Sequence, residues 1–189
     1  MNPYNGHDYV EIGGLKWATK NVGANSITDT GLYFRWGDTQ GYTPAQCING
    51  DFTINYKYYD GENWAPTSEF STNYPNYGDS MLSSDDPATV LMGSGWRTPS
   101  DQEWLSLTDN ADVTFTVNYN NSNIPGYIFT DKLDNTKVLF LPALYAYDGF
   151  TSDPPFPYST TDIDYNTHYW TSLQAGAGEG FGYAQYFYP

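Results

Sequence analysis

A switch of hydrophobic period near residue 113 restricts the fold of this chain more than any other feature. Downstream of it, short runs rich in β-branched and aromatic residues alternate with polar ones, which is typical of strands. The runs are "VTFTVNY" (113–119), "GYIFTDKL" (126–133), "KVLFLPAL" (137–144), "HYWTSL" (168–173) and "GYAQYFY" (182–188). We expect the first three to form an antiparallel meander, with Asp134-Asn135 in the tight turn between the last two of them. Two more short strand pieces, joined at Gly13-Gly14, are expected in "DYVEIGGLKWATKNV" (8–22).

One clear helix signal precedes this switch. Ser100 and Glu103 have the spacing of a capping box, in which the serine oxygen accepts the N3 amide and the glutamate returns to the N-cap amide. Trp104 then begins an apolar side, so a helix is predicted from about Asp101 to Asp109-Asn110. The segment "DDPATVLMG" (85–93) predicts one or two further helical turns. Helices followed by an antiparallel sheet indicate an α+β fold.

The composition agrees with strands and long ordered loops in one domain. Aromatic residues make up 19% of the chain, and the 18 Gly and 12 Pro residues favour turns over a helical bundle. Residues 37–80 lack a helical period, and we expect them to form a long loop that covers the core. At 189 residues, the chain is long enough to bury a sizeable core as a single domain spanning residues 1–189.

Charge and cysteine content exclude several classes of partner and site. The formal charge is −15, from 22 acidic and 7 basic residues. Binding to nucleic acid or to an anionic membrane surface needs clustered Lys and Arg, so neither partner is expected. No apolar run approaches the length of a membrane span, so membrane insertion is not expected either. Cys47 is the only cysteine, which excludes an internal disulfide and a cysteine-based zinc site.

Four blocks of the sequence, taken in order, resemble the Fibrobacter succinogenes major paralogous domain family. They cover most of residues 7–173 and read "HDYVEIGGLKWATKNVGANSITDTGLYFRWGDT", "SSDDPATVLMGSGWRTPSDQEWLSL", "GYIFTDKLDNTKVLFLPALYAYDG" and "YWTSL". This family is similar to C-type-lectin-fold domains, which include formylglycine-generating-enzyme-like domains and the variable proteins of diversity-generating retroelements. The resemblance implies a C-type-lectin-like fold of short helices and a twisted antiparallel sheet. It also implies an extracellular, cell-surface or virion protein whose role is binding.

The sequence departs from the family at two points. Family members continue to a final strand, whereas this chain stops at Pro189, just after "YAQYFYP". The resemblance implies that this last strand pairs near residues 8–12, so we expect that edge to be exposed, covered by a loop, or completed by another chain in a homo-oligomer. The second departure concerns the formylglycine-generating relatives, which hold copper with a pair of cysteines. Cys47 alone cannot do so, and that activity is excluded.

The charged cluster in "GSGWRTPSDQEW" (93–104) could be catalytic or structural. In the family this block is framework. Glu103 is already assigned to the capping box, and Arg97 beside Trp96 can bind backbone carbonyls or a carboxylate. We therefore assign structural roles, with Arg97 mostly buried, to the residues Trp96, Arg97, Ser100, Glu103 and Trp104.

Other candidate chemistry is weaker. His7 and His168 are the only histidines, and no nucleophile-elbow pattern accompanies them. Asp162 and Asp164 begin a calcium-loop pattern in "DIDYNT" (162–167), but Thr167 stands where the loop needs Gly. A looser Ca²⁺ site including Asp148 or Asp153 is an alternative, although solvated carboxylates are favoured, and no cofactor is expected. The adjacent carboxylates Asp85 and Asp86 could suggest glycoside hydrolysis. The simpler interpretation is that they begin a helix, whose positive N-terminal end favours acidic residues.

The C-terminal segment, residues 138–189, is the favoured binding region. It holds 14 of the 35 aromatic residues and neither Lys nor Arg. Tyr together with Ser, Gly and Asn supplies rigid contact area and adaptable hydrogen bonds, although the same tyrosines could simply cap a small core with their hydroxyls in water. We expect Tyr183 and Gln185 to share one strand face, with the Ala184 side turned inward. The predicted ligand contacts are Tyr145, Tyr147, Asp148, Tyr165, Asn166, His168, Tyr183 and Gln185.

These observations favour a non-enzymatic ligand-binding domain for a surface protein or a glycan. If the retroelement branch of the resemblance applies, the variable positions lie in the C-terminal loops and strands. A structural module of a surface or virion assembly, with its aromatic face against a neighbouring chain, is the alternative from another class. A carbohydrate-active enzyme has no residue pattern in its favour.

Overall fold

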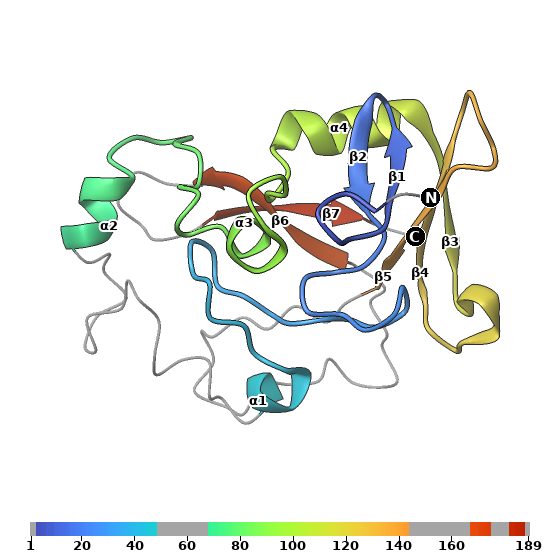
Figure 1. Ribbon diagram of the computed structural model, residues 1–189, viewed down its shortest axis with the longest axis horizontal. Helices are drawn as coiled ribbons and strands as arrows, with labels where there is room; N and C mark the ends of the chain where they lie inside the picture. The colour runs from blue at the N-terminus through green and yellow to red at the C-terminus, as the bar shows by residue number, and fades with distance from the viewer. Residues whose placement is uncertain (1–2, 49–67, 144–166, 175–181, 188–189) are drawn as a thin grey trace.

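The computed structural model describes residues 3–48, 68–143, 167–174 and 182–187. These residues form an α+β arrangement of short helices and antiparallel strands (Figure 1). In chain order the elements are β1 (Tyr9–Ile12), β2 (Leu15–Ala18), α1 (Pro44–Ile48), α2 (Ser68–Asn73), α3 (Pro87–Met92), α4 (Asp101–Asn110), β3 (Ala111–Thr116), the 3₁₀ turn η2 (Tyr119–Asn121), β4 (Gly126–Asp131), β5 (Val138–Pro142), β6 (Thr167–Gln174) and β7 (Gly182–Phe187).

The N-terminal hairpin forms as the sequence predicts. β1 and β2 are antiparallel, with Ile12 opposite Leu15. Gly13 and Gly14, which join them, have φ angles of 61° and 77°, a left-handed pair that glycine adopts without strain and that matches the twist of a two-residue hairpin. Within the described part of the chain, β1 pairs with β2 and with no other strand.

The predicted meander is also confirmed. β3, β4 and β5 form an antiparallel sheet in the order β3-β4-β5, with Phe129 opposite both Val113 and Leu139. The turn between β4 and β5 is fixed by side chains, because Asp131 Oδ1 accepts the amides of Leu133 and Asp134, each at 2.8 Å.

Helices occur where a continuous loop was expected. α1 and α2 lie inside residues 37–80, so the expectation of a segment without helix is wrong at these two places. Both are only five or six residues long, too short to show a helical period. α2 is held by tertiary packing, since Phe70, at 0% exposed, and Tyr74, just after the helix, pack with Trp36 in a small separate cluster.

The main core lies where α4 packs between the β1–β2 hairpin and the meander. Trp104 and Leu107 of α4 are buried there, and the rings of Trp17 and Trp104 are 5.2 Å apart. Tyr169 of β6 packs against this core from the C-terminal side. The buried members of the cluster are Ile12, Trp17, Trp104, Leu107, Ala111, Tyr127, Phe129, Leu139 and Leu141.

β6 lies between the main core and the small cluster of Trp36, Phe70 and Tyr74, and it is hydrogen-bonded on both of its edges. On one side it pairs antiparallel with β7, with Tyr169 opposite Gln185 and Trp170 opposite Ala184, and both strands lie where the sequence predicts strands. On the other side, Ser172 donates its amide to Pro99 O at 2.8 Å and accepts the Met81 amide at 2.7 Å. β6 therefore joins segments that are far apart in the sequence.

Indole N–H groups complete the attachment of β6. Trp36 Nε1 donates to Thr171 O at 2.9 Å, and Trp104 Nε1 donates to Trp170 O at 3.3 Å. Trp170 itself donates from Nε1 to Phe34 O at 2.8 Å.

None of the helices in the described residues is long and apolar enough to span a bilayer.

We predict that Trp36→Phe lowers the free energy of unfolding by about 1–3 kcal/mol, because the buried Thr171 carbonyl loses its donor where water does not replace it. Denaturant unfolding measures this change. Trp170→Phe is the matched control, since its bond to Phe34 is exposed and water can take its place. Equal losses in the two variants would show that the burial of the Trp36 bond has no special importance.

Candidate functional site

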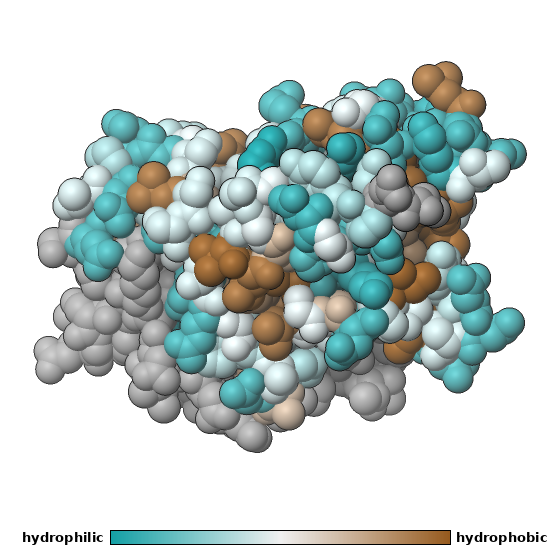
Figure 2. All heavy atoms as spheres, in the orientation of Figure 1, coloured by the Kyte–Doolittle hydropathy of each residue, from teal (hydrophilic) through white to brown (hydrophobic). Residues whose placement is uncertain are grey.

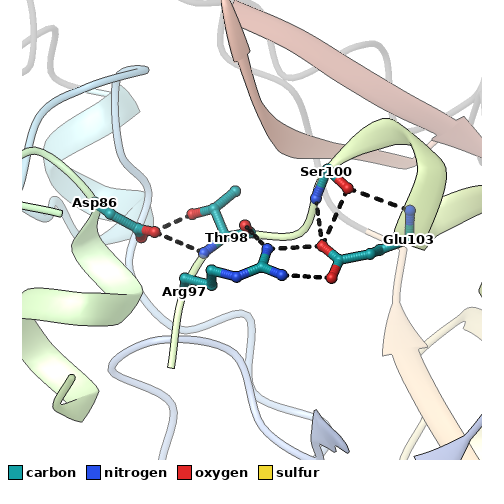
Figure 3. Close-up of polar contacts among 5 residues, drawn as sticks. All are labelled: Asp86, Arg97, Thr98, Ser100 and Glu103. Atoms are coloured by element: carbon teal, nitrogen blue, oxygen red, sulfur yellow. Dashed lines mark hydrogen bonds and ion pairs between the residues drawn. The ribbon is translucent and has the colours of Figure 1, made fainter. Parts of the chain in front are cut away.

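The charged cluster before α4 is a helix cap with an ion pair added to it (Figure 3). Ser100 Oγ accepts the Glu103 amide at 3.4 Å, and Glu103 Oε2 accepts the Ser100 amide at 2.9 Å. The predicted capping box is therefore confirmed. Arg97 then donates from both terminal nitrogens to the two oxygens of Glu103, at 2.7 and 2.5 Å.

Arg97 is more exposed than the sequence suggested. Its side chain is 57% exposed, so the expectation that it is mostly buried is wrong, while its expected bond to a carboxylate is present. The physical reason is that its partner, Glu103, lies in the first turn of α4 with its side chain 20% exposed, so the guanidinium reaches it from the solvent side. An exposed ion pair of this kind contributes less than about 1 kcal/mol.

The pair shifts the titration of both groups. The hydrogen bonds from Arg97 hold the pKa of Glu103 below its usual value, against a smaller opposing effect of burial. The same bonds raise the pKa of Arg97. Glu103 is therefore ionised at neutral pH, and its carboxylate accepts four hydrogen bonds from Arg97 and Ser100, which suits a structural role.

Asp85 and Asp86 are buried carboxylates with structural partners. Asp86 caps α3 by accepting the Ala88 amide at 2.9 Å, and it also accepts the amide and hydroxyl of Thr98 at 2.8 and 2.9 Å (Figure 3). Asp85 accepts the Tyr74 hydroxyl at 2.7 Å. The predicted helix start at this pair is confirmed. The two carboxylates therefore bind different parts of the framework.

The remaining framework tryptophans are buried. Trp96 is 7% exposed, its Nε1 donates to Tyr4 O, and its ring meets those of Tyr4 and His7 edge-on. Trp104 is 3% exposed and bonded to β6. With the bond from Ser172 to Pro99, these contacts hold the block 96–104 against β6.

β6 carries the described part of the predicted binding surface. His168 is half-buried at the start of the strand, and burial lowers its pKa, so the imidazole is neutral at pH 7. Tyr183 and Gln185 lie on β7, whose backbone is paired with β6. The structure therefore brings position 185 next to the strand that carries His168. Tyr145, Tyr147, Asp148, Tyr165 and Asn166 lie outside the described residues, as do Asp153 and the calcium candidates Asp162 and Asp164.

The strand register fixes how the backbones of β6 and β7 lie beside each other. Gln185 is opposite Tyr169, whose ring packs against the main core, and Ala184 is opposite Trp170, which is 38% exposed. The side chains of β7 are not among those that the structure describes, so the expectation that the Ala184 side faces inward stays a prediction.

Trp170 is an exposed aromatic residue of β6 that the sequence analysis does not include among the predicted ligand contacts. It lies two residues after His168, so alternation puts both on the outer face of β6. Its indole N–H is bonded to Phe34 O, which fixes one edge of the ring while the side chain stays partly open to solvent. The sequence feature that points to Trp170 is its spacing of two residues from His168, one of the predicted ligand contacts.

Tyr169 points the other way and is structural. Its hydroxyl donates to Pro142 O at 3.1 Å and accepts from Asn21 Nδ2 at 3.2 Å. Burial raises the pKa of this hydroxyl. Tyr169 therefore connects β6 to the end of β5 and to the N-terminal loop, and it keeps the opposite face of the strand turned outward.

Comparison with protein-family models, with curated proteins and with solved structures finds no match for this chain. Within the described residues, no group of three or more His, Cys, Asp or Glu side chains is placed to hold a metal ion.

We predict that Ser100→Ala lowers the free energy of unfolding by about 1 kcal/mol, because the Glu103 amide loses its acceptor at the N-terminus of α4. Denaturant unfolding measures the loss, and Ser106→Ala, in the interior of the same helix, is the control. A loss no greater than that of the control would contradict the importance of the cap.

We also predict that Glu103 contributes to acid sensitivity. Its folded pKa lies below the unfolded value of about 4.3, so its stabilising effect is present above that value and is lost as pH falls through the folded pKa. The stability difference between the unaltered protein and Glu103→Gln should be largest at neutral pH and shrink below about pH 4. Urea unfolding at several pH values tests this, and a difference independent of pH would contradict it.

Proposed function

We propose that the chain is a non-enzymatic ligand-binding domain, and that the outer face of β6, with Trp170 and His168, forms part of its binding surface. The observation that carries this proposal is the state of Trp170, which is 38% exposed although its indole N–H is bonded within the protein. A ring held in place before a ligand arrives loses little conformational freedom on binding. Tryptophans in such positions are enriched at recognition sites.

The neighbouring groups favour a neutral, polar ligand. His168 is half-buried, and burial lowers its pKa, so its imidazole carries no charge at pH 7. Residues 138–189 contain neither Lys nor Arg, which argues against an anionic ligand. An uncharged, partly polar surface beside an exposed ring suits a sugar ring, and it also suits the polar surface of a protein.

The framework supports a binding role over an enzymatic one. Asp85, Asp86 and Glu103 are each held in hydrogen bonds that build helix caps or tertiary contacts. Arg97 is engaged with Glu103. These charged groups therefore serve the scaffold on which a binding face is presented.

The resemblance noted in the sequence extends this proposal. A C-type-lectin-like fold, on an extracellular, cell-surface or virion protein, would present the C-terminal strands as the recognition surface for a surface protein or a glycan. If the gene is diversified by a retroelement, a reverse transcriptase gene and a near-identical template repeat lie beside it. Sequencing the genomic neighbourhood tests that part separately from ligand binding.

We predict that Trp170→Ala weakens ligand binding by about 1–2 kcal/mol, because the ligand loses the aromatic contact. Binding is screened on a glycan array and a panel of surface proteins, then quantified by calorimetry. Trp170→Phe keeps an aromatic ring and should retain most of the affinity, which separates the ring contact from the bond to Phe34.

Tyr77→Ala is the matched control, since Tyr77 is 64% exposed but lies outside β6. Equal binding by Trp170→Ala and the unaltered protein would contradict the proposed surface. Loss of binding only in step with a lower melting temperature would contradict it as well.

A further inference from the structure

Among the residues that the structure describes, β3 is the outer strand of the meander, and one of its edges has no partner strand. In the described residues it pairs with β4 alone, through six consecutive residue pairs from Ala111 to Thr116. Figure 1 shows it at the rim of the molecule, with the sheet continuing on one side only. An edge of this kind presents unpaired backbone N–H and C=O groups to which another strand can add.

The side chains along this edge do little to block such pairing. Residues 113–117 read "VTFTV", a run of β-branched and aromatic residues without charge, proline or glycine. Val113 is 40% exposed and Val117 is 61% exposed. In Figure 2, apolar side chains reach the surface at this rim. Asp112 is the one charged residue in the strand, and protective devices such as an edge lysine are missing from it.

We propose that this edge joins the β3 edge of a second copy of the chain, antiparallel about a two-fold axis at Thr114, to make one continuous six-stranded sheet. The choice of occupant rests on the self-complementarity of the strand. In this register Thr114 lies opposite Thr114 of the second copy, and the numbers of any two residues that face each other add to 228. Val113 then faces Phe115, which is half-buried, and Asp112 faces Thr116.

This register suits both faces of the sheet. On the core-side face, the exposed flank of Val113 is covered by an aromatic ring, a favourable cross-strand pair. On the other face, two threonines meet at the axis, and the two Asp112 carboxylates are kept apart because each lies opposite a threonine. If the second strand were shifted by two residues, so that Asp112 faced Thr114, the two Asp112 carboxylates would lie close to each other and repel.

The net charge of the chain influences how strongly the proposed dimer associates. Each copy carries a formal charge of −15, so the two chains repel at long range while the paired strands themselves are nearly uncharged. Salt screens the repulsion between the chains and leaves the backbone hydrogen bonds and apolar contacts in place. The dimer should therefore be weak at low ionic strength and become stronger as salt is added.

Sedimentation equilibrium of the full chain, over a concentration series extending to the millimolar range and at two salt concentrations, tests the association. The expected result is a monomer–dimer equilibrium whose dissociation constant falls with added salt. A monomer at every concentration and salt level would overturn the proposal.

Charged variants test the location. Thr114→Lys places two lysines face to face at the axis and should raise the dissociation constant by about tenfold or more. Val138→Lys makes the same change of charge on the same sheet face, but on β5 at the opposite edge, and should leave the dimer intact. Disruption by both variants, or by neither, would overturn the assignment to β3. Circular dichroism and melting temperature confirm that each variant is folded.

Cysteine pairing tests the register. Asp112→Cys and Thr116→Cys should each stay uncross-linked alone and form a disulfide when mixed under mild oxidation, because these positions face each other only across the two copies. The native Cys47 does not interfere, since it is 1% exposed and burial raises its pKa to about 11. Cross-linking of either variant with itself, in preference to the mixture, would overturn the proposed register.

This association does not depend on the proposed function. The Thr114→Lys variant keeps β6 unchanged, so its ligand binding per chain should match that of the unaltered protein. The two proposals can therefore fail separately.

Discussion

The backbone of β6 accepts indole N–H groups from two tryptophans that belong to different parts of the chain. Trp36 comes from the N-terminal loop region and Trp104 from α4, and their acceptors, Thr171 O and Trp170 O, are consecutive. A buried indole N–H without an acceptor destabilises the folded state by the cost of removing it from water. Both aromatic clusters therefore depend on β6 being in place.

The same strand determines where the charged framework lies. The bond from Ser172 to Pro99 fixes the residue just before the Ser100 cap, so α4 begins at a point set by β6. From there, Glu103 holds Arg97 at the surface, and Asp86 holds Thr98 on the side of α3. The charged cluster of residues 93–104 is thus a set of connections between helices and one strand. The face of β6 opposite Tyr169 carries Trp170, which is 38% exposed.

Local signals in the sequence predicted much of this arrangement. The capping box at Ser100 and the Gly13-Gly14 hairpin depend on a few neighbouring residues, so their patterns are complete in the sequence. The meander follows from alternation over strands of ordinary length. The exposure of Arg97 could not be obtained in this way. It depends on which elements pack alongside, and that is settled by contacts between residues far apart in the chain.

The candidate site also combines features that the sequence predicts with features that depend on tertiary packing. Spacing placed His168 on a strand and two residues from Trp170, but the sequence could not distinguish an exposed tryptophan from a buried one. That difference comes from Tyr169, whose hydroxyl is bonded to Pro142 and Asn21 and so commits the other face of β6 to the core. The short helices α1 and α2 were missed because a single turn carries too little periodicity, and their stability comes from packing.

The attachment of β6 also has a consequence for the order of folding. The bonds from Trp104, Trp36 and Trp170 join residues separated by 66, 135 and 136 positions. Contacts across such long stretches of chain close large loops and slow the folding reaction relative to a domain with local contacts. During synthesis, Trp36 and Trp104 leave the ribosome before the residues of β6 that accept their indole N–H groups. Until β6 docks, these indoles lack their native acceptors, and the nascent chain carries aromatic surface that the folded protein buries.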